Sequence, residues 1–385
     1  MRFPEFSGEW NKYTINDLAT VVGGGTPDTT VKSYWGGDIQ WFTPSEIGKN
    51  KYVDFSKRTI TRDGLDNSSA KLLPLHTILL SSRATVGECS IASNECTTNQ
   101  GFQSLIAKQC NIDFLYYLIQ TKKKDLIRNA CGSTFLEISA NEIRKIKVAV
   151  PVQNEQEQIA KLLSLIDERI ATQNKIIEKL QSLIKGLVDE LMTVLLKGKL
   201  YLFSSFYIKA GEGGTPTTSV VEYYTEGTIP FIKIEDLSCK YLTNNKDFIT
   251  ELGMQKSSAW LIPSKSVIYS NGATIGAISI NEYPVCTKQG ILGIVPNTNI
   301  NVEYLYLLMS SSYFSKEISR IITEGTMKTA YLKDINHIKC PLPSMAQQKN
   351  ITNLTSSIEE KLSIEQELLR FLNLQKQYLL HMIFI

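Results

Sequence analysis

Apolar side chains recur at a regular helical spacing along residues 151–197. They are separated alternately by four and three positions, and one polar residue, Gln173, interrupts the series. This heptad spacing is typical of a coiled coil and predicts one helix of about 40 residues, roughly 60 Å long at 1.5 Å per residue. The seam positions are Ile159, Leu163, Ile166, Ile170, Gln173, Ile177, Leu180, Ile184, Leu187 and Leu191.

A second segment, residues 343–385, has a similar but weaker seam, which Thr355, Glu365 and Lys376 interrupt. Because one chain supplies both helices, we expect an intramolecular antiparallel coiled coil, with a globular domain at each end and an approximate two-fold axis. Gln173 and Glu365 are then expected to lie close together near that axis, as polar residues that fix the register. The seam positions here are Ile358, Leu362, Glu365, Leu369, Leu372 and Leu379.

The remaining parts of the chain alternate short apolar runs with turns rich in Gly, Pro, Asn and Ser. Runs rich in β-branched and aromatic residues predict strands, and apolar residues at three- and four-residue spacing predict helices. Both parts therefore belong to an α+β fold class. The predicted strands are 38–42, 77–80, 102–107 and 145–150 in the first part and 229–234, 266–269, 291–295 and 337–342 in the second, with helices at 112–128 and 301–322.

The two parts are copies of one another. Short matches recur in one order at an offset of about 190 residues, which chance similarity does not explain. The chain therefore divides into a first domain, 1–150, a helix, 151–197, a second domain, 198–342, and a helix, 343–385. The matches include Gly24–Pro27 with Gly213–Pro216, Tyr34 with Tyr224, Ala84–Gly87 with Ala273–Gly276, and Gln100–Gly101 with Gln289–Gly290. The lead-in of the second copy, Leu200 to Ala210, does not match that of the first by sequence.

Composition limits the function classes only broadly. A net charge of +3 permits nucleic-acid binding without arguing for it. No apolar run approaches the roughly 18 residues of a membrane-spanning helix, and no secretory leader is recognisable, so we expect a cytoplasmic protein. The seven cysteines form no CxxC pair and the three histidines are scattered. These patterns predict neither a disulfide framework nor a metal site.

The sequence contains no recognisable catalytic motif. The cluster Gly23–Pro27 lacks the Lys-Ser/Thr of a phosphate-binding loop and the GxGxxG spacing, so it is interpreted as a structural turn. An adenine methyltransferase needs an Asp/Asn-Pro-Pro-aromatic motif, but the chain has no Pro-Pro pair. A PD-(D/E)xK nuclease motif and a Ser-His pair common to both copies are also missing. These features predict a binding protein that is not an enzyme.

The ordered motifs are familiar as a set. The GGTP turns, Trp41–Pro44, Ser82–Gly87, Asn99–Phe102 and the Pro-x-x-x-Glu-Gln opening of the first long helix closely resemble the specificity subunit of bacterial type I restriction-modification systems. This resemblance implies that residues 1–150 and 198–342 are target recognition domains, each reading one half of a split, asymmetric DNA site. It also implies that the long helices set the distance between the half-sites and dock two methylation subunits.

The same resemblance implies the partners and cofactors. The partners are double-stranded DNA, two methylation subunits and, for cleavage, restriction subunits. S-adenosylmethionine, ATP and Mg²⁺ are expected on those partner subunits, and this chain is expected to hold no cofactor. Two alternatives stay open, an autonomous nuclease or methyltransferase and a coiled-coil adaptor that binds no DNA.

Candidate DNA contacts follow from comparing the copies. Features shared by both copies are expected to hold phosphates or shape loops, whereas bases are expected to be read where the copies differ. The candidates are Lys32, Arg83, Asn99 and Gln100 in the first copy and Lys233, Asn271, Lys288 and Gln289 in the second.

Overall fold

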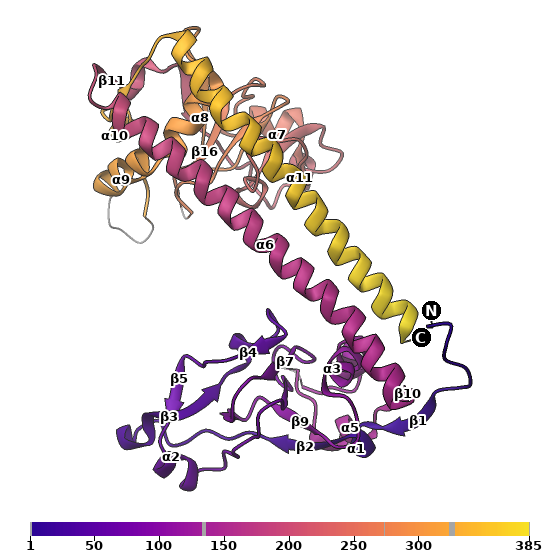
Figure 1. Ribbon diagram of the computed structural model, residues 1–385. Coiled ribbons are helices and arrows are strands. Elements are labelled where there is room, and N and C mark those ends of the chain that lie inside the picture. The colour runs from indigo at the N-terminus through magenta and orange to yellow at the C-terminus, as the bar shows by residue number, and fades with distance from the viewer. Residues whose placement is uncertain (1, 133–135, 273, 323–327, 385) are drawn as a thin grey trace. The chain divides into compact units, whose positions relative to one another are not determined.

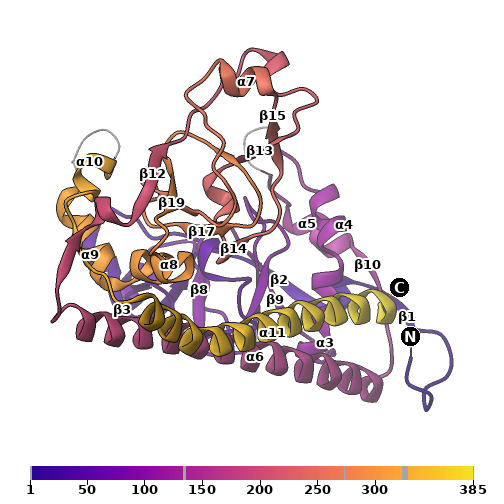
Figure 2. The ribbon, with the colours of Figure 1, turned by 90° about the horizontal axis from the view of Figure 1, so that it is seen from above.

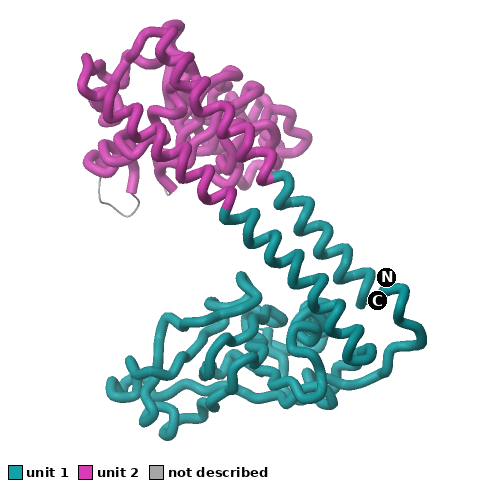
Figure 3. The backbone as a smooth tube through the Cα atoms, viewed as in Figure 1, with its two compact units in different colours: residues 1–175, 367–385 teal, residues 176–366 magenta. Residues whose placement is uncertain are grey.

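The protein consists of two compact units, each containing one globular domain and a segment of each long helix (Figure 3). The structure, a computed structural model, describes residues 2–132, 136–272, 274–322 and 328–384. Unit 1 comprises Met1–Lys175 and Glu367–Ile385, and unit 2 comprises Ile176–Gln366. The ends of the long helices therefore belong to different units, and each unit is described by itself below.

Unit 1 contains ten strands and a set of short helices in its described residues. The strands are β1 (Asn11–Thr14), β2 (Ala19–Gly23), β3 (Trp35–Phe42), β4 (Tyr52–Val53), β5 (Arg58–Ile60), β6 (Ile78–Leu80), β7 (Cys89–Ala92), β8 (Cys96–Thr98), β9 (Gln103–Ala107) and β10 (Lys147–Val150). The helices are α1 (Ile15–Leu18), η1 (Lys32–Tyr34), η2 (Pro44–Glu46), α2 (Arg62–Asp66), α3 (Ile112–Thr121), α4 (Lys123–Arg128) and α5 (Ala140–Lys145).

Unit 2 repeats this series. Its strands are β11 (Leu200–Leu202), β12 (Tyr207–Glu212), β13 (Ile229–Ile232), β14 (Tyr241–Leu242), β15 (Asp247–Ile249), β16 (Val267–Ser270), β17 (Ile278–Asn281), β18 (Cys286–Thr287), β19 (Ile291–Pro296) and β20 (Lys339–Pro341). Its helices are η3 (Phe203–Ser205), η4 (Val221–Tyr223), η5 (Ile234–Asp236), α7 (Glu251–Gln255), α8 (Val302–Ser310), α9 (Ser312–Ile321) and α10 (Leu332–Ile335).

The sheet topology confirms the duplication. Unit 1 has a five-stranded sheet in the order β2-β9-β6-β7-β4, a three-stranded sheet β5-β3-β8 and a pair β1-β10. Unit 2 has β12-β19-β16-β17-β14, β15-β13-β18 and β11-β20, which is the same order strand for strand. The register agrees as well, since Tyr52 pairs with Ile91 and Tyr241 pairs with Ile280. The predicted α+β class with two sheet-containing domains and a long helix between them is therefore correct.

The structure corrects two details of the alignment. Thr61 N donates to Tyr34 O at 3.0 Å, and Thr250 N donates to Tyr223 O at 2.9 Å, so Tyr34 corresponds to Tyr223 and not to Tyr224. The lead-in segments also correspond, because β11 pairs with β20 as β1 pairs with β10. The two lead-in segments are similar in their backbone pairing and not in their side chains. Many different side chains are compatible with such pairing, so sequence comparison does not detect it. Ala273, part of one predicted match, lies outside the described residues.

The helices predicted at 112–128 and 301–322 are each divided in two. Lys122 separates α3 from α4 with φ −88° and ψ 5°. Ser311 separates α8 from α9 in an extended conformation, and its Oγ accepts a hydrogen bond from Phe314 N at 3.2 Å. Apolar residues continue on both sides of each break, so their spacing alone predicts one helix. The break in unit 2 is an N-cap, which starts a new helix in a new direction.

The two long helices are α6 (Gln153–Leu195, 43 residues) and α11 (Met345–Ile383, 39 residues). In unit 1 the start of α6 and the end of α11 share a core, to which Leu163 and Ile383 contribute. In unit 2 the end of α6 and the start of α11 share a core, to which Met192 and Ile351 contribute. The helices are therefore antiparallel within each unit, and their segments lie side by side in two views (Figures 1 and 2).

The buried faces of the long helices follow the predicted seam for most of their length. In α6, Ile159, Leu163 and Ile177 are buried, whereas near its end Val188 and Met192 are buried and Val194 is 61% exposed. The buried face has rotated there because Val188 and Met192 also pack in the core beneath α8. In α11 the polar seam residues Thr355 and Glu365 are buried. Gln173 and Glu365 belong to different units, so their expected proximity stays a prediction.

Two glutamines explain why a Pro-x-x-x-Glu/Gln-Gln motif precedes each long helix. Gln156 is buried, its Oε1 accepts from Asn111 N at 3.0 Å and its Nε2 donates to Pro151 O at 2.9 Å. Gln348 repeats both bonds, to Asn301 N at 2.8 Å and Pro343 O at 2.9 Å. Each glutamine thus fastens the long helix to the N-terminus of the helix that covers the sheet, α3 or α8.

Within the described residues, no helix is both long and apolar enough to cross a membrane. The cysteines are all free, and five of them are buried. Burial raises the pKa of Cys89, Cys96 and Cys110 to about 12 and that of Cys286 to about 11. Burial also raises the pKa of Cys340. Cys131 and Cys239 are exposed.

The glutamine fastening predicts a stability difference between two substitutions in α6. Gln156→Leu leaves Asn111 N and Pro151 O without their partner, which is expected to lower the free energy of unfolding by about 1–3 kcal/mol. Gln158→Leu, at an exposed position two residues away, is the matched control and is expected to change it by less than about 0.5 kcal/mol. Urea unfolding followed by circular dichroism measures both. Equal midpoints for the two variants would contradict the assignment.

The cysteine environments predict selective alkylation. Only thiolates react, and a raised pKa together with burial keeps a thiol protonated and out of reach. In the folded protein at pH 8, iodoacetamide is expected to label Cys131 and Cys239, and in urea all seven cysteines. Peptide mass spectrometry identifies the labelled positions. Rapid labelling of Cys89 or Cys340 in the folded protein would show that these cores are not packed as described.

Candidate nucleic-acid interface

In each unit, three turns meet at one end of the five-stranded and three-stranded sheets. Turn cluster 1 consists of residues 24–27, 81–85 and 99–101, and turn cluster 2 consists of residues 213–216, 270–272 and 288–290. In turn cluster 1, Gly25 N donates to Thr98 O at 2.8 Å, and Ser82 N donates to Gly101 O at 2.8 Å. In turn cluster 2, Gly213 N donates to Ile291 O at 2.9 Å, and Asn271 N donates to Gly290 O at 3.0 Å. Backbone bonds therefore hold both clusters.

The first turn of each cluster requires glycine because another backbone lies directly against it. A Cβ on Gly24 would lie 2.1 Å from Asn99 O, and a Cβ on Gly213 would lie 2.1 Å from Thr287 O. The second glycine is equally confined, since a Cβ on Gly25 would lie 2.4 Å from Ala70 N. The GGTP motif is therefore a turn in close contact with another backbone, as the sequence predicted.

Side chains complete the contact between the turns. In turn cluster 1, Thr26 Oγ1 donates to Gln100 Oε1, and Asn99 Oδ1 accepts from Gly101 N at 2.9 Å. In turn cluster 2, Gln289 N donates to Thr215 Oγ1 at 3.4 Å. Both backbone and side-chain bonds therefore join the turns, while the hydroxyls of Ser82 and Ser270 are buried there without a hydrogen-bond partner.

Three of the four candidate residues in unit 1 lie in turn cluster 1. Arg83 and Gln100 are exposed and Asn99 is half-buried. Arg83 Nε lies 3.5 Å from Glu137 Oε2, an ion pair that is open to solvent on both sides. Lys32 is exposed in η1, outside the cluster. Their role as DNA contacts stays a prediction.

In unit 2 the candidates differ more in their environment. Lys288 and Gln289 are exposed in turn cluster 2. Asn271 is 1% exposed and its Nδ2 donates to Ala330 O at 3.1 Å, so in this structure it holds a loop and does not face solvent. Lys233, at the end of β13, forms an ion pair with Asp247 at 2.9 Å. The hydrogen bond to Asp247 raises the pKa of Lys233, so this amine stays protonated at neutral pH.

The structure adds exposed cations that sequence patterns did not single out. Arg58 stacks on Trp35 with its guanidinium carbon 3.6 Å from the ring centroid, and Lys209 lies 4.2 Å from the ring of Trp260. An aromatic face holds a long side chain in one orientation while its charge remains available to a phosphate. The aromatic and the cation are far apart in sequence in both pairs, so no local motif signals them.

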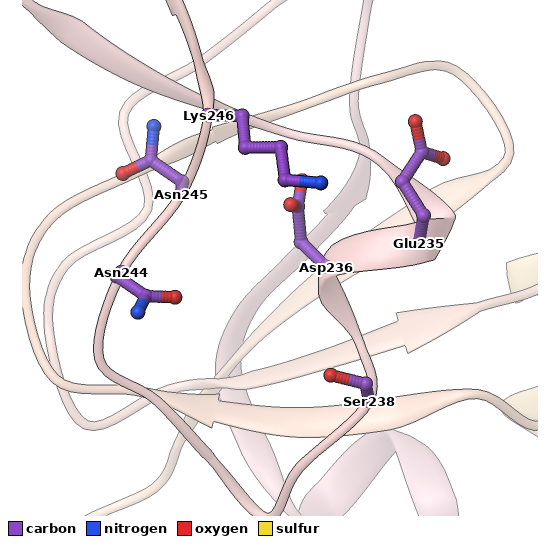
Figure 4. Close-up of a pocket in the computed structure, with 6 residues that line it drawn as sticks. All are labelled: Glu235, Asp236, Ser238, Asn244, Asn245 and Lys246. Atoms are coloured by element: carbon purple, nitrogen blue, oxygen red, sulfur yellow. The ribbon is translucent and has the colours of Figure 1, made fainter. Parts of the chain in front are cut away.

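A polar hollow of about 390 Å³ lies beside η5 in unit 2 (Figure 4). Glu235, Asp236 and Lys246 line it together with Ser238, Asn244 and Asn245, and Lys246 points toward Asp236 (Figure 4). Carboxylates repel phosphates, so this hollow does not extend turn cluster 2 as a surface for the DNA backbone. No group of three or more His, Cys, Asp or Glu suited to a metal ion occurs within the ranges that the structure describes.

Comparison with known proteins decides the family. The family model of the type I restriction modification DNA specificity domain matches residues 7–182 and 206–373, once for each copy. The chain belongs to this family. The resemblance that its motifs indicated is confirmed.

Relatives in this family match along nearly the whole chain. The type I restriction enzyme MjaIX specificity subunit of Methanocaldococcus jannaschii is 29% identical over 382 residues, which cover 92% of this chain and 88% of the relative. A crystal structure of the type I restriction-modification S subunit from M. genitalium has a TM-score of 0.56 at 19% identity, covering 100% of this chain and 99% of that one. A chain from a study of type I complex assembly and conformational transition has a TM-score of 0.61 at 14% identity, covering 99% and 98%. At these identities the two structures show a shared fold.

The close contact of the GGTP turns predicts that alanine disturbs them. Gly24→Ala and Gly213→Ala each force two backbones apart, which is expected to lower the free energy of unfolding by about 1–3 kcal/mol. Gly186→Ala is the control, because a Cβ there meets nothing within 4 Å and alanine favours a helix. Thermal unfolding of the three variants tests this. Unchanged stability in both turn variants would rule out the close contact.

Proposed function

We propose that the chain is the DNA-reading subunit of a type I restriction-modification complex and that each unit reads one half of a bipartite, asymmetric site. The observation that carries this proposal is the pair of turn clusters. Equivalent backbone bonds join their turns, from Ser82 N to Gly101 O and from Asn271 N to Gly290 O, whereas two side chains differ: half-buried Asn99 corresponds to exposed Lys288, and exposed Arg83 to Gly272. Shared backbone with different side chains is what reading two unlike half-sites requires.

The long helices suit the second part of this function. A stiff connection between two DNA-binding domains makes binding of the second half-site intramolecular once the first is bound. The two short half-sites are then recognised together as one longer site. It also fixes the separation of the half-sites, as the geometry of a dimer does in other DNA-binding proteins. We propose that α6 and α11 supply this connection and dock two methylation subunits.

The chemistry belongs to the partners in this proposal. The chain has no phosphate-binding loop, no Asp/Asn-Pro-Pro-aromatic motif and no nuclease motif in its sequence. S-adenosylmethionine, ATP and Mg²⁺ are therefore assigned to the methylation and restriction subunits. The chain itself directs adenine methylation, and cleavage, to the sites that it reads.

Methylome sequencing tests this function. When the chain is expressed with its methylation subunits in a host that lacks adenine methylation, one new bipartite motif with unlike halves is expected. The matched control omits this chain and is expected to give none. The proposal would be contradicted by methylation in cells that lack this chain, or by a single continuous motif in place of a bipartite one.

DNA binding by the assembled methylation complex is expected to depend steeply on salt. Each phosphate contact contributes a slope of about −0.9 to log K against log salt, so a few contacts lower affinity more than tenfold between 50 and 200 mM salt. Fluorescence anisotropy with a duplex that carries the methylated motif measures this slope. An adaptor that binds proteins only would show no salt-dependent binding to DNA.

A further inference from the structure

A largely buried lysine occupies the same position in both copies. Lys51 directly precedes β4 and Lys240 directly precedes β14, and their side chains are 10% and 14% exposed. The carbonyl of each accepts a hydrogen bond from the neighbouring strand, from Ile91 N and Ile280 N, both at 2.7 Å. The backbone of each lysine is thus part of the recognition domain's sheet.

In unit 1 the amine of Lys51 leaves the sheet and reaches two helices. It forms an ion pair with Asp113 of α3 at 2.7 Å and donates to Ser164 Oγ of α6 at 2.6 Å. It also lies 3.3 Å from the hydroxyl of Tyr117. Tyr52, the next residue, donates its hydroxyl to the same Asp113 at 2.7 Å.

Unit 2 repeats this arrangement with a different long helix. Lys240 pairs with Glu359 of α11 at 2.5 Å and lies 3.9 Å from Glu303 of α8. Tyr241 donates its hydroxyl to Glu303 at 2.6 Å, as Tyr52 does to Asp113. In both units a Lys-Tyr pair therefore connects the sheet, the covering helix and one long helix.

These contacts are directional. A buried ammonium is costly unless it is paired in good geometry, so the lysine favours one arrangement of its partners over others. Aromatic faces further confine it, because Lys51 lies 4.7 Å from the ring of Tyr117 and Lys240 lies 5.2 Å from that of Tyr241. Apolar contacts between sheet and helix do not have this directional preference.

We propose that Lys51 and Lys240 are positioning residues that fix how each turn cluster is oriented on the long-helix segment of its own unit. This inference rests on the proposed function, since the orientation of each reader determines which half-site separation the complex accepts. The lysines do not touch DNA in this account. They act through the sheet that carries the turns.

The two units differ in how many other polar contacts join the covering helix to the long helices beside the lysine. In unit 1, Tyr117 donates to Asp167 at 2.7 Å, and Lys376 of α11 pairs with the same Asp167 at 2.7 Å. In unit 2, the equivalent residue Leu307 has no hydroxyl. A hollow of about 790 Å³ lies there between α8, the C-terminal part of α6 and the first half of α11, and Lys240 lines it. Lys240 therefore has less support, and its loss is expected to matter more.

A library of sites with varied spacing tests the inference. The complex with Lys240→Met is expected to recognise the same two half-site sequences as the wild type. The measured quantity is methylation of sites whose spacer is one base pair longer or shorter, divided by methylation at the preferred spacing. This ratio is expected to be at least tenfold higher in Lys240→Met than in the wild type. Lys51→Met is expected to show a smaller change. Lys246→Met, at an exposed lysine of the same unit, is the control. A lysine that only stabilises the fold would lower methylation at all spacings equally, and that result would overturn the inference.

A distance measurement separates this inference from the proposed function. Spin labels on Glu251→Cys in α7 and Asn353→Cys in α11, with Cys131 and Cys239 replaced by serine, report the orientation within unit 2 without DNA. The distance distribution is expected to broaden in Lys240→Met and in Glu359→Gln but not in Lys246→Met. If the distance distribution is unchanged in a folded Lys240→Met variant, the positioning role is wrong. This conclusion holds even if the wild-type complex methylates a bipartite site as proposed. If the wild type directs no bipartite methylation, the proposed function is wrong. A broader distribution in Lys240→Met would in that case still show that Lys240 positions the domain on the long-helix segments of unit 2.

Discussion

The burial of the apolar seams of α6 and α11 is the constraint on which both units depend. Neither globular domain completes its core alone: Leu163 and Ile383 belong to the core of unit 1, and Met192 and Ile351 belong to that of unit 2. Each domain therefore includes long-helix segments that come from distant parts of the chain. Burial of such side chains contributes about 1.5–3 kcal/mol each, so loss of a seam residue weakens a domain as well as the helix pair.

Polar contacts add direction to this apolar packing. The glutamines at the start of each long helix fasten it to α3 or α8, and the buried lysines fasten the sheets to the same helices. Hydrophobic contact alone is nondirectional, whereas buried polar groups accept only a few arrangements. Under the proposed function, such arrangements would fix the orientation of each domain on its long-helix segments, while the side chains that contact DNA would differ between the two domains. Backbone hydrogen bonds join the turns of both clusters, and side chains such as Thr26 and Gln100 add to them.

Much of this organisation could be predicted from the sequence, because it rests on periodic or local signals. The heptad spacing located α6 and α11, and the apolar runs located four of the ten strands in the described residues of each unit: β3, β6, β9 and β10 in unit 1 and β13, β16, β19 and β20 in unit 2. The other strands are short or lack a continuous apolar run, so the pattern did not mark them. Tertiary effects were missed: the burial of Asn271 depends on Ala330, 59 residues later, and the helix break at Ser311 lies inside a continuous apolar pattern. The Lys-Tyr pair at Lys51 and Lys240 was a usable signal, since it recurs at the repeat offset. The sequence could not predict which exposed residues would contact bases under the proposed function, because that depends on loop geometry and not on spacing.

The central claim is that each unit reads its own half-site independently. Its most direct test replaces residues 200–341, from β11 to β20, with a second copy of residues 11–150, from β1 to β10, so that both readers are alike. Methylome sequencing of cells that express this chain with the methylation subunits is predicted to show a motif whose two halves are inverted copies of one original half-site. A motif that stays asymmetric, or whose halves both differ from the original half-site, would contradict the account.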